Sequence, residues 1–406
     1  MNPELADQIR SASAQETARR RYPEGFPALP PVPAGRYTDP AFFELEREHV
    51  FGKSWLFAAH VDELREPGDV IVIDHLFAPI LLTRGSDGEV RAFYNVCSHR
   101  GSPLLGPGKH HVRRRIVCPY HAWTYELTGE LGSVTEERDF KNLDRSCLGL
   151  RAVRCEHFAG FVFVNFDAVA PPLRTVLGTV VEEMDDEVGD KAPGTEYHLI
   201  KKCSYEIAGN WKLAVDANLE TYHVNVLHRD TVAGAIDLHT TTIALYASGQ
   251  SRMFLRQRPG IAAEIPLPRF PHVGDLAGEG VLTYSLFPNI AWVISPQLMF
   301  TTNSWPVAHD RTRYDLYFVG AGPATEETQP VWDLIIGFNV NVIEEDVEAI
   351  QGMQCSLNSG ALEGIPLSYQ ERRIYQTHEE IDRQIGIDRI PPSLRVTPVL
   401  GPVIEH

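Results

Sequence analysis

The sequence predicts an α+β protein in which an all-β domain precedes a domain of mixed strands and helices. Short runs rich in β-branched and aromatic residues, separated by Gly, Pro and Asp, fill residues 55–166. After residue 168, strand-like runs alternate with longer stretches of helical periodicity. With 406 residues, the chain is long enough for two or three domains that each bury a core of their own.

Three parts are expected along the chain. Residues 1–45 form a helical and proline-rich lead-in that lies over other surfaces without a core of its own. The all-β domain covers residues 46–167, and the mixed domain covers residues 168–406. The strands of the all-β domain are expected at 70–73, 80–83, 90–95, 115–117 and 161–165.

The mixed domain is expected to open on a solvated helix face, because residues 182–187 carry five acids. Further helices are expected from about 211, over about 329–356 and over about 367–386. Strands are expected at 199–207, 282–286, 291–295 and 314–319.

The composition excludes several classes of protein. Lys and Arg number 37 against 54 Asp and Glu, and the net charge of −17 argues against nucleic-acid binding. No run reaches the roughly 18 apolar residues of a membrane span, and no apolar segment precedes Arg19 as a secretory signal would require. Six cysteines are too sparse for a disulfide framework. We therefore expect a cytoplasmic protein without membrane partners.

Two loops of the all-β domain each offer one thiol and one imidazole. The first reads Cys-Ser-His-Arg-Gly and contains Cys97 and His99, and the second reads Cys-Pro-Tyr-His-Ala-Trp and contains Cys118 and His121. Two Cys and two His suit either tetrahedral zinc or an iron–sulfur centre in which the thiolates hold one iron and the imidazoles the other. Zinc fingers usually keep both cysteines in one loop, so the distribution favours the iron–sulfur centre.

A second group of metal-binding residue types lies in the mixed domain. His223 and His228 are five residues apart, which in an ideal helix separates them by about 140° in azimuth. Both can face one metal only if the helix ends, or carries a π-type turn, between them. A carboxylate would complete the facial triad of a non-haem Fe(II) site. The acids of residues 343–351 are candidates, and spacing alone does not choose among them.

Residues 109–115 form a basic island, Lys-His-His-Val-Arg-Arg-Arg, between the two loops of the all-β domain. One interpretation is a docking surface for an acidic electron-donor protein. The other is a solvated hairpin without a partner, which is the commoner role of a charge run.

The two loops resemble those of Rieske [2Fe-2S] domains at all their distinctive positions. Residues 210–228 begin with Asn-Trp-Lys and continue with an acid, two residues, His, four residues and His. This order resembles the mononuclear-iron segment of the large (alpha) subunits of Rieske non-haem iron aromatic-ring-hydroxylating oxygenases. The two resemblances together cover nearly the whole chain.

The resemblance implies a role for each residue of the two groups. In the cluster, Cys97 and Cys118 would bind one iron and His99 and His121 the other. The Fe(II) ligands would be His223, His228 and Asp346, with Glu345 as the next candidate for the carboxylate; Glu220 matches the acid that links an iron-binding histidine to a Rieske histidine of the neighbouring subunit.

The family also implies the fold and the reaction. A Rieske [2Fe-2S] domain would precede a catalytic domain of the helix-grip (START-like) type with an antiparallel sheet. The protein would be the oxygenase component of a multicomponent system, in which electrons pass from NAD(P)H through a separate ferredoxin or flavin reductase to the cluster, and O2 is the co-substrate. Hydroxylation, dihydroxylation or oxidative demethylation of a small organic compound, expected to be aromatic, would follow. A homotrimer is expected, and a small beta subunit is compatible with the family.

Two departures from the family pattern bear on the substrate. Many ring-dihydroxylating members have Asp where this chain has Glu220, and Asn where it has Ala217. Neither change removes a ligand, so the reaction class is unaffected. Two alternatives remain open at this point: a Rieske electron-transfer protein without oxygenase activity, and a zinc-stabilised binding module.

Overall fold

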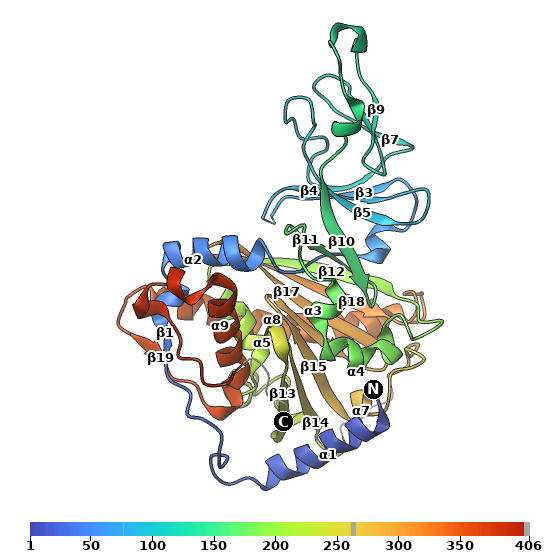
Figure 1. Ribbon diagram of the computed structural model, residues 1–406. Coiled ribbons are helices and arrows are strands. Elements are labelled where there is room, and N and C mark those ends of the chain that lie inside the picture. Colours follow the sequence, from blue (N-terminus) through green and yellow to red (C-terminus); the bar gives the residue numbers. More distant parts are fainter. Residues whose placement is uncertain (76, 261–264, 402–406) are drawn as a thin grey trace. The chain divides into compact units, whose positions relative to one another are not determined.

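The structure is a computed structural model that describes residues 1–75, 77–260 and 265–401 (Figure 1). It divides into two compact units. We call Phe51–Leu173 the β unit, and Met1–Val50 together with the chain from Arg174 onward the mixed unit. The predicted α+β class is confirmed, and the lead-in is part of the mixed unit.

The β unit contains two antiparallel sheets. The larger sheet has the order β2-β11-β10-β5-β4-β3-β6 and the smaller has the order β7-β8-β9. The strands are β2 (Leu56–His60), β3 (Asp69–Ile73), β4 (Ile80–Arg84), β5 (Val90–Tyr94), β6 (Gly108–His111), β7 (Arg115–Val117), β8 (Thr124–Glu126), β9 (Leu131–Ser133), β10 (Ala152–Phe158) and β11 (Phe161–Asn165).

All five strands predicted for the β unit are present, although half of the strands described there were not predicted. The strands that were not predicted are β2, β6, β8, β9 and β10. The core of the unit contains both loop cysteines, Cys97 and Cys118, beside Phe93, Ile116 and Trp123. The packing of the unit therefore fixes the two loops.

The mixed unit is built on a seven-stranded antiparallel sheet with the order β12-β18-β17-β16-β15-β14-β13. Four of these strands were predicted, and β13, β14 and β17 were not. The strands are β12 (His198–Ile207), β13 (Ile236–Leu245), β14 (Ser251–Gln257), β15 (Gly280–Leu286), β16 (Ile290–Ile294), β17 (Leu298–Ala308) and β18 (Arg311–Gly320).

Three helices, α5 (Trp211–Leu219), α8 (Gln329–Leu357) and α9 (Arg372–Ile385), pack with this sheet around one apolar core (Figure 1). Among the described residues, no helix combines the length and the apolarity needed to cross a bilayer. The remaining helices are α1 (Pro3–Ala18), α2 (Pro40–Glu46), α3 (Leu173–Leu177), α4 (Thr179–Val188), α6 (Val224–Leu227) and α7 (Leu276–Glu279).

Helix α9 begins at Arg372, five residues later than predicted. The residues before it form a 3-10 turn, 369–371, that is closed by a capping box. The Ser368 N–H donates to the Glu371 carboxylate at 2.8 Å. Polar residues ahead of a helix satisfy backbone groups in a turn, and the helical periodicity does not show this difference.

The prediction that residues 182–187 form a solvated helix face is wrong. The run lies in α4, where Glu183 and Asp185 are buried. Glu183 accepts hydrogen bonds from Tyr246 at 2.6 Å and from Arg252 at 2.5 Å. These partners are more than 60 residues away in the sequence. The local charge pattern predicted that these acids are exposed, but their pairing with residues distant in the sequence buries them.

The lead-in is held to the rest of the mixed unit by strand pairing and by hydrogen bonds. Strand β1 (Val32–Pro33) pairs antiparallel with β19 (Gly364–Ile365). Ser13 on α1 donates its hydroxyl to the Thr240 carbonyl of β13 at 2.9 Å. The lead-in is therefore packed against β13 and β19 of the mixed unit.

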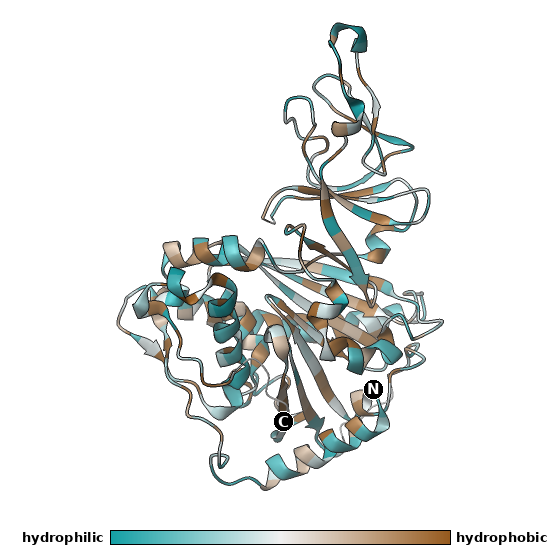
Figure 2. Ribbon diagram, viewed as in Figure 1, coloured by the Kyte–Doolittle hydropathy of each residue, from teal (hydrophilic) through white to brown (hydrophobic). Residues whose placement is uncertain are grey.

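Helix α9 is strongly polar and nevertheless buried. It is mostly teal in Figure 2, and Arg373, His378 and Asp382 are among its buried residues. Asp382 pairs with Arg36 of the lead-in at 2.6 Å. A buried charge of this kind is tolerated only when it is paired and hydrogen-bonded.

We predict that the buried pair between Glu46 of α2 and Lys212 of α5 is needed for stability. The carboxylate lies 2.7 Å from the ammonium, and neither side chain is more than 1% exposed. The variant Glu46→Ala leaves the ammonium buried without its partner, and should lower the free energy of unfolding by about 3 kcal/mol. Unfolding in urea measures this loss.

The control is Glu44→Ala in the same helix. Glu44 and its partner Arg47 are 58% and 45% exposed, and the expected loss is below about 0.5 kcal/mol. Equal losses in the two variants would contradict the burial argument.

Candidate functional site

The two loops of the β unit are closed by the same pair of backbone hydrogen bonds. In the first, the Cys97 N–H donates to the Ser102 carbonyl at 2.9 Å, and the Gly101 N–H donates to the Cys97 carbonyl at 2.9 Å. In the second, the Cys118 N–H donates to the Trp123 carbonyl at 2.8 Å, and the Ala122 N–H donates back to the Cys118 carbonyl at 3.0 Å. The loops are therefore two copies of one local structure.

Both loops need a left-handed residue at the same place. Gly101 and Ala122 are each four residues after the loop cysteine, and their φ angles are +77° and +55°. Glycine adopts this conformation freely, whereas alanine does so at a cost of about 1 kcal/mol. The alanine persists because the hydrogen bonds of the loop hold it there.

Cys97 and Cys118 form the buried side of the first group, and each is 2% exposed. The Tyr125 hydroxyl accepts the Ser98 N–H at 3.0 Å, so its own proton is available to Cys97 Sγ at 3.1 Å. Burial would raise the pKa of Cys118, but hydrogen bonds from backbone N–H groups of its own loop and from the Cys97 and Ser102 side chains together outweigh burial and lower the pKa below its ordinary value. These donors favour thiolate sulfur, which is the metal-binding form.

His99 and His121 lie side by side, with ring centroids 4.7 Å apart. Trp123 stacks on His99, at 4.7 Å between centroids and 9° between planes. Burial and the neighbouring cations lower the pKa of His99, so its imidazole is neutral. Its Nδ1 is buried and has no hydrogen-bond partner among the described residues. A buried nitrogen of this kind suits a metal ligand.

The arrangement fits a two-iron cluster better than a single zinc ion. Four ligands of one tetrahedral ion must all lie within about 4 Å of one another. Among the described residues, only a group in the mixed unit brings three such ligand atoms within 4.8 Å, and it includes neither loop cysteine. Thiols on one side and imidazoles on the other suit a cluster with two irons.

The second group depends on where α5 ends. The helix ends at Leu219, and Glu220 is extended, with φ −141° and ψ 174°. His223 and His228 then flank the single turn of α6. Their ring centroids are 5.0 Å apart. The helix thus ends before the two histidines, which removes the 140° separation expected of a continuous helix.

Asp346 on α8 faces both histidines. Its Oδ1 lies 3.0 Å from His228 Nε2 and 3.6 Å from His223 Nε2. One ligand atom from each of the three residues lies within 4.8 Å of the others. Two imidazole nitrogens and one carboxylate in this position suit an Fe(II) ion with open coordination positions.

The outer nitrogen of each imidazole contacts a second carboxylate. His228 Nδ1 lies 2.6 Å from Glu345 Oε2, which also accepts the Thr231 hydroxyl at 2.9 Å. His223 Nδ1 contacts Glu220 in the same way. Glu345 is therefore placed behind His228, on the side away from Asp346. Carboxylates in this position orient metal-binding imidazoles and fix their tautomer.

The acids also affect protonation of the site. Burial would lower the pKa of His228, but hydrogen bonds to Asp346 and Glu345 outweigh it and raise the pKa above its ordinary value. A proton and a metal ion compete for the same nitrogen. Asp346 and Glu345 therefore stabilise a positive charge at His228, whether a proton or a metal ion supplies it.

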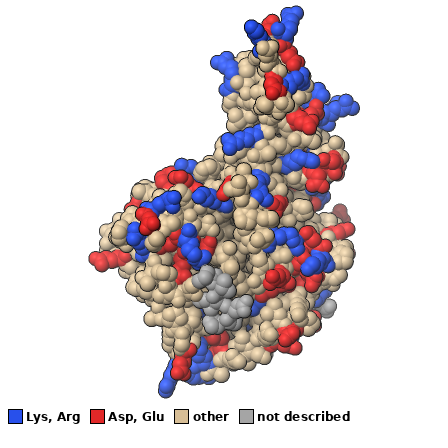
Figure 3. Space-filling view, viewed as in Figure 1, with Lys and Arg blue, Asp and Glu red and all other residues tan. Residues whose placement is uncertain are grey.

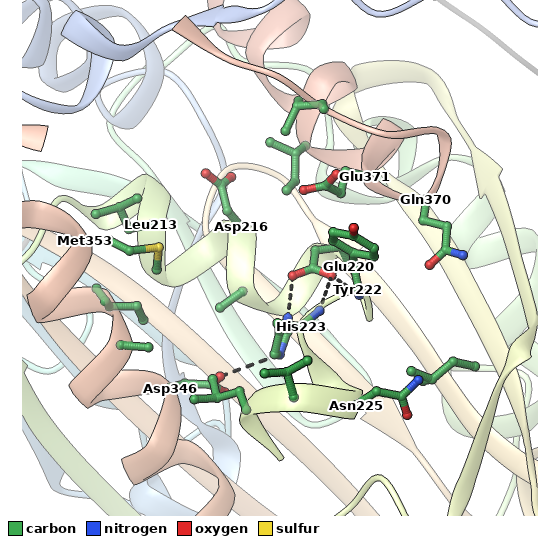
Figure 4. Close-up of a pocket in the computed structure, with 18 of the residues that line it drawn as sticks. Leu213, Asp216, Glu220, Tyr222, His223, Asn225, Asp346, Met353, Gln370 and Glu371 are labelled. Carbon is green, nitrogen blue, oxygen red and sulfur yellow. Dashed lines mark hydrogen bonds and ion pairs between the residues drawn. The ribbon is translucent and has the colours of Figure 1, made fainter. Parts of the chain in front are cut away.

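A cavity of about 1150 Å³ opens beside the triad (Figure 4). Glu220, His223 and Asp346 lie on its wall and point toward one another. Apolar side chains from α5, α8 and α9, and from the segment before α9, form much of the remainder: Leu213, Ala217, Ile350, Met353, Ile365, Leu367 and Ile374. The cavity can hold an organic molecule next to the triad.

One wall of the cavity is supported by a buried hydrogen-bonded chain. The Arg36 Nε–H donates to His378 Nδ1 at 3.0 Å, so a neutral His378 carries its proton on Nε2 and donates it to the Tyr37 hydroxyl at 2.8 Å. Burial and neighbouring cations hold the pKa of His378 well below its ordinary value. Tyr37 then donates to Asp216 Oδ2 at 2.7 Å. The chain fixes the carboxyl of Asp216 at the cavity.

The sequence analysis did not identify the series of hydrogen bonds from Arg36 to Asp216 or the role of the Tyr125 hydroxyl. Arg36 and His378 are 342 residues apart, and Tyr37 and Asp216 are 179 apart, so no local pattern joins them. Glu345 was considered only as an alternative to Asp346. Adjacent positions on a helix point about 100° apart, so the sequence could have shown that Glu345 and Asp346 do not both face the same ion.

Two family models match the chain. The model for the Rieske [2Fe-2S] domain matches residues 54–144, which contain both loops of the first group. The model for the ring hydroxylating alpha subunit (catalytic domain) matches residues 195–387, which contain the triad.

Curated relatives and solved structures extend over most of the chain. The carnitine monooxygenase oxygenase subunit of Escherichia coli (strain K12) is 39% identical over 362 residues, which are 84% of this chain and 89% of that protein. The subunit of the same description from Acinetobacter baumannii is 31% identical over 360 residues, covering 86% of this chain and 92% of that protein. A solved quaternary ammonium Rieske monooxygenase, described as giving insights into carnitine oxidation by gut microbiota and inter-subunit electron transfer, has a TM-score of 0.74 at 25% identity, covering 90% of this chain and 99% of that chain.

We predict that Asp216 makes stability depend on pH. Burial raises its pKa to about 7, so in the iron-free folded protein it keeps its proton after the unfolded chain has lost it. Stability should therefore fall as the pH rises from about 4 to about 7. The variant Asp216→Asn should remove this fall, and its stability advantage over the wild type should grow by about 2 kcal/mol between pH 5 and pH 8. Urea unfolding at the two pH values measures it, and an advantage that stayed constant would refute the assignment.

Proposed function

Because this chain belongs to the family of Rieske oxygenase alpha subunits, we propose that it oxidises a small quaternary ammonium compound with O2. The protein is an oxidoreductase and the oxygenase component of a Rieske oxygenase, as the sequence predicted. Neither a pure electron carrier nor a zinc-stabilised module is retained, because the catalytic-domain model also matches. The expected aromatic substrate has no specific support, since the relatives described above are named for carnitine.

We assign the two metal groups as follows. The [2Fe-2S] cluster would be held by Cys97, His99, Cys118 and His121, and the Fe(II) ion by His223, His228 and Asp346. When bound, the cluster would carry single electrons and the iron would activate O2 at its open coordination positions. The orphaned His99 Nδ1 and the convergence of three ligand atoms within 4.8 Å support this assignment.

The residues around the Fe(II) site position its ligands. Glu220 and Glu345 accept the Nδ1 protons of His223 and His228 and leave both Nε2 lone pairs directed toward Asp346. Each imidazole is thereby held in one orientation, with its Nε2 toward Asp346. The apolar side chains of the cavity wall can contact the apolar part of a bound organic molecule.

The charge of the cavity is the main support for a quaternary ammonium substrate. Five acids line it. Asp230 is paired with Arg229, the one guanidinium among the described lining residues, and the pKa of Asp216 is raised to about 7, which leaves Glu220, Asp346 and Glu371 as the unpaired negative charges. The quaternary ammonium group of a substrate is attracted to such a site, whereas a benzoate-like anion, which has no positive group, is repelled. Tyr37 and Tyr222 add aromatic surface, which also favours quaternary ammonium groups.

Electrons would reach this site from another copy of the chain. Glu220 has its two oxygens engaged by His223 and by backbone N–H groups, yet a carboxylate has about four acceptor positions and retains room for one more donor. We assign that position to His121 of the next subunit in a homotrimer. The relative of known structure is described with inter-subunit electron transfer, which supports the assignment. A separate reductase or ferredoxin, ultimately oxidising NAD(P)H, would supply the electrons.

Oxygen consumption tests the proposed function. Iron-loaded protein with a one-electron donor should consume O2 faster with carnitine or glycine betaine than with benzoate, and should release an amine or formaldehyde in proportion. Formaldehyde would indicate oxidation of an N-methyl group, and a free trimethylamine would indicate oxidation of the carbon on the other side of nitrogen. Stimulation by benzoate alone would refute the substrate class and leave the oxygenase assignment standing.

The variant His223→Ala should lose the mononuclear iron and keep the cluster. One of three protein ligands is removed, and weakly held Fe(II) does not tolerate that loss. Iron analysis should fall from about three to about two per chain, with the visible spectrum of the cluster unchanged. His239→Ala is the matched control, because this exposed histidine lines the same cavity outside the triad. Retained turnover in His223→Ala would show that the ligand assignment is wrong.

The variant Glu220→Gln should slow electron delivery without removing either metal. The amide keeps the size of the side chain but loses the charge that strengthens its hydrogen bonds to imidazole. In single-turnover experiments, reoxidation of the reduced cluster should slow by about tenfold or more, while reduction by dithionite proceeds as in the wild type. An unchanged reoxidation rate, or full activity of a monomer at high dilution, would contradict the inter-subunit route.

A further inference from the structure

The charge of this chain is unevenly distributed along its length. Residues 90–125 contain six cations, Arg91, Arg100, Lys109, Arg113, Arg114 and Arg115, and neither Asp nor Glu. Since the whole chain has a net charge of −17, the rest of it carries −17 − 6 = −23. This basic segment contains both loops of the first metal group. A cluster held by two thiolates and two neutral imidazoles has at most about one negative charge, so it does not require six cations.

Some of these cations already have partners within the β unit. Arg91 pairs with Asp87 at 2.7 Å, and Arg115 pairs with Glu126 at 2.6 Å. The Arg100 guanidinium lies 5.3 Å from the centre of the Tyr120 ring. These three cations each have a partner within the β unit and need no external one.

Arg113 and Arg114 differ from these three in having no partner of either kind among the described residues. They are exposed and occupy the bend between β6 and β7, and no carboxylate among the described residues pairs with either. Adjacent arginines repel each other, and a third follows at Arg115. Nothing within the described part of the fold compensates this repulsion, which makes the pair available to an external anion. Figure 3 shows Lys and Arg side chains projecting from the part of the molecule that carries β7 and β9.

The strand that follows leads from this pair to the cluster loop. β7 is an edge strand of its sheet, and its residue Ile116 is buried while Val117 is 50% exposed. Tyr120, in the loop itself, is 56% exposed. From Arg114 to Cys118 the chain spans about 13 Å at strand geometry. Exposed arginine beside exposed aromatic and aliphatic side chains is the composition of a protein interface.

We propose that Arg113, Arg114 and the exposed side of β7 form the docking surface for the electron-donor protein, an acidic iron–sulfur protein whose carboxylates pair with the two arginines. The inference rests on the proposed function, which requires such a donor. Docking here brings the partner to the strand that directly precedes Cys118, one of the residues assigned to the cluster. The strongly acidic remainder of the chain repels the same partner elsewhere.

A second copy of this chain fits the surface less well. In the proposed trimer, the imidazole side of the loops faces the next subunit. The two arginines are at the opposite end of β7 from Cys118. The donor and the neighbouring subunit therefore use different ends of this strand, and electrons enter and leave the cluster without competition for one surface.

The test follows reduction of the cluster in a stopped-flow instrument. The probe is a plant-type [2Fe-2S] ferredoxin, an acidic one-electron donor, and the readout is bleaching of the visible absorbance of the cluster. The double variant Arg113→Glu/Arg114→Glu should lower the second-order rate constant at least about tenfold at low salt, and the difference should shrink as salt screens the charges. Reduction by dithionite should be as fast as in the wild type, because this small reductant needs no docking surface.

The matched control is Arg20→Glu/Arg21→Glu in the lead-in. It reverses two exposed arginines and gives the same net charge, −17 − 4 = −21, at a place outside the β unit. Its rate constant should stay within about twofold of the wild type. Equal slowing in the two double variants, or a wild-type rate that does not depend on salt, would overturn the proposal.

Two further results separate the possible failures. A change of sedimentation coefficient in Arg113→Glu/Arg114→Glu would show that the surface joins copies of the chain, and would overturn the donor assignment. A protein whose cluster is reduced as predicted but that oxidises no quaternary ammonium compound would contradict the proposed function and leave the docking surface established.

Discussion

The end of α5 at Leu219 is the constraint on which the second metal group depends. If the helix continued, His223 and His228 would diverge by about 140°, and no single ion could reach both. Glu220 stops it by adopting an extended conformation and by accepting the N–H groups of Tyr222 and His223 on its side chain. The same carboxylate also contacts the imidazole of His223. One residue thus ends the helix, orients the imidazole of His223 and lies on the wall of the cavity.

The position of α5 depends in turn on buried polar contacts with distant segments. Lys212 pairs with Glu46 at the end of α2, and Asp216 receives the hydroxyl proton of Tyr37 in the lead-in, so two successive turns of α5 are tied to residues 37–46. Tyr37 is itself held by His378 of α9. Buried polar groups leave few alternative arrangements, because every misplacement leaves a donor or acceptor unsatisfied. We regard this network as the reason that α5 presents its last turn to α8 in one register.

The two metal groups are built in different ways. The loops of the β unit are local structures, each closed within six residues by backbone hydrogen bonds and each containing a left-handed residue at the same position. The triad of the mixed unit joins residues more than 100 positions apart and exists only when α6 and α8 are packed together. Local closure suits a cluster that carries electrons with little rearrangement, whereas a site formed by packing can border a cavity shaped for a substrate.

The sequence by itself determined the fold class and singled out the two Cys–His loops and the histidine pair, because these depend on local periodicity and on short spacings between residue types. It also determined five strands of the β unit, and it missed β2, β6, β8, β9 and β10. It left Asp346 and Glu345 as alternatives. Only the tertiary structure placed Asp346 between the two Nε2 atoms and Glu345 behind His228, since the rotation of α8 about its axis is set by packing. The tertiary structure alone also decided that Glu183 and Asp185 are buried, because their environment depends on residues that only the folded chain brings near.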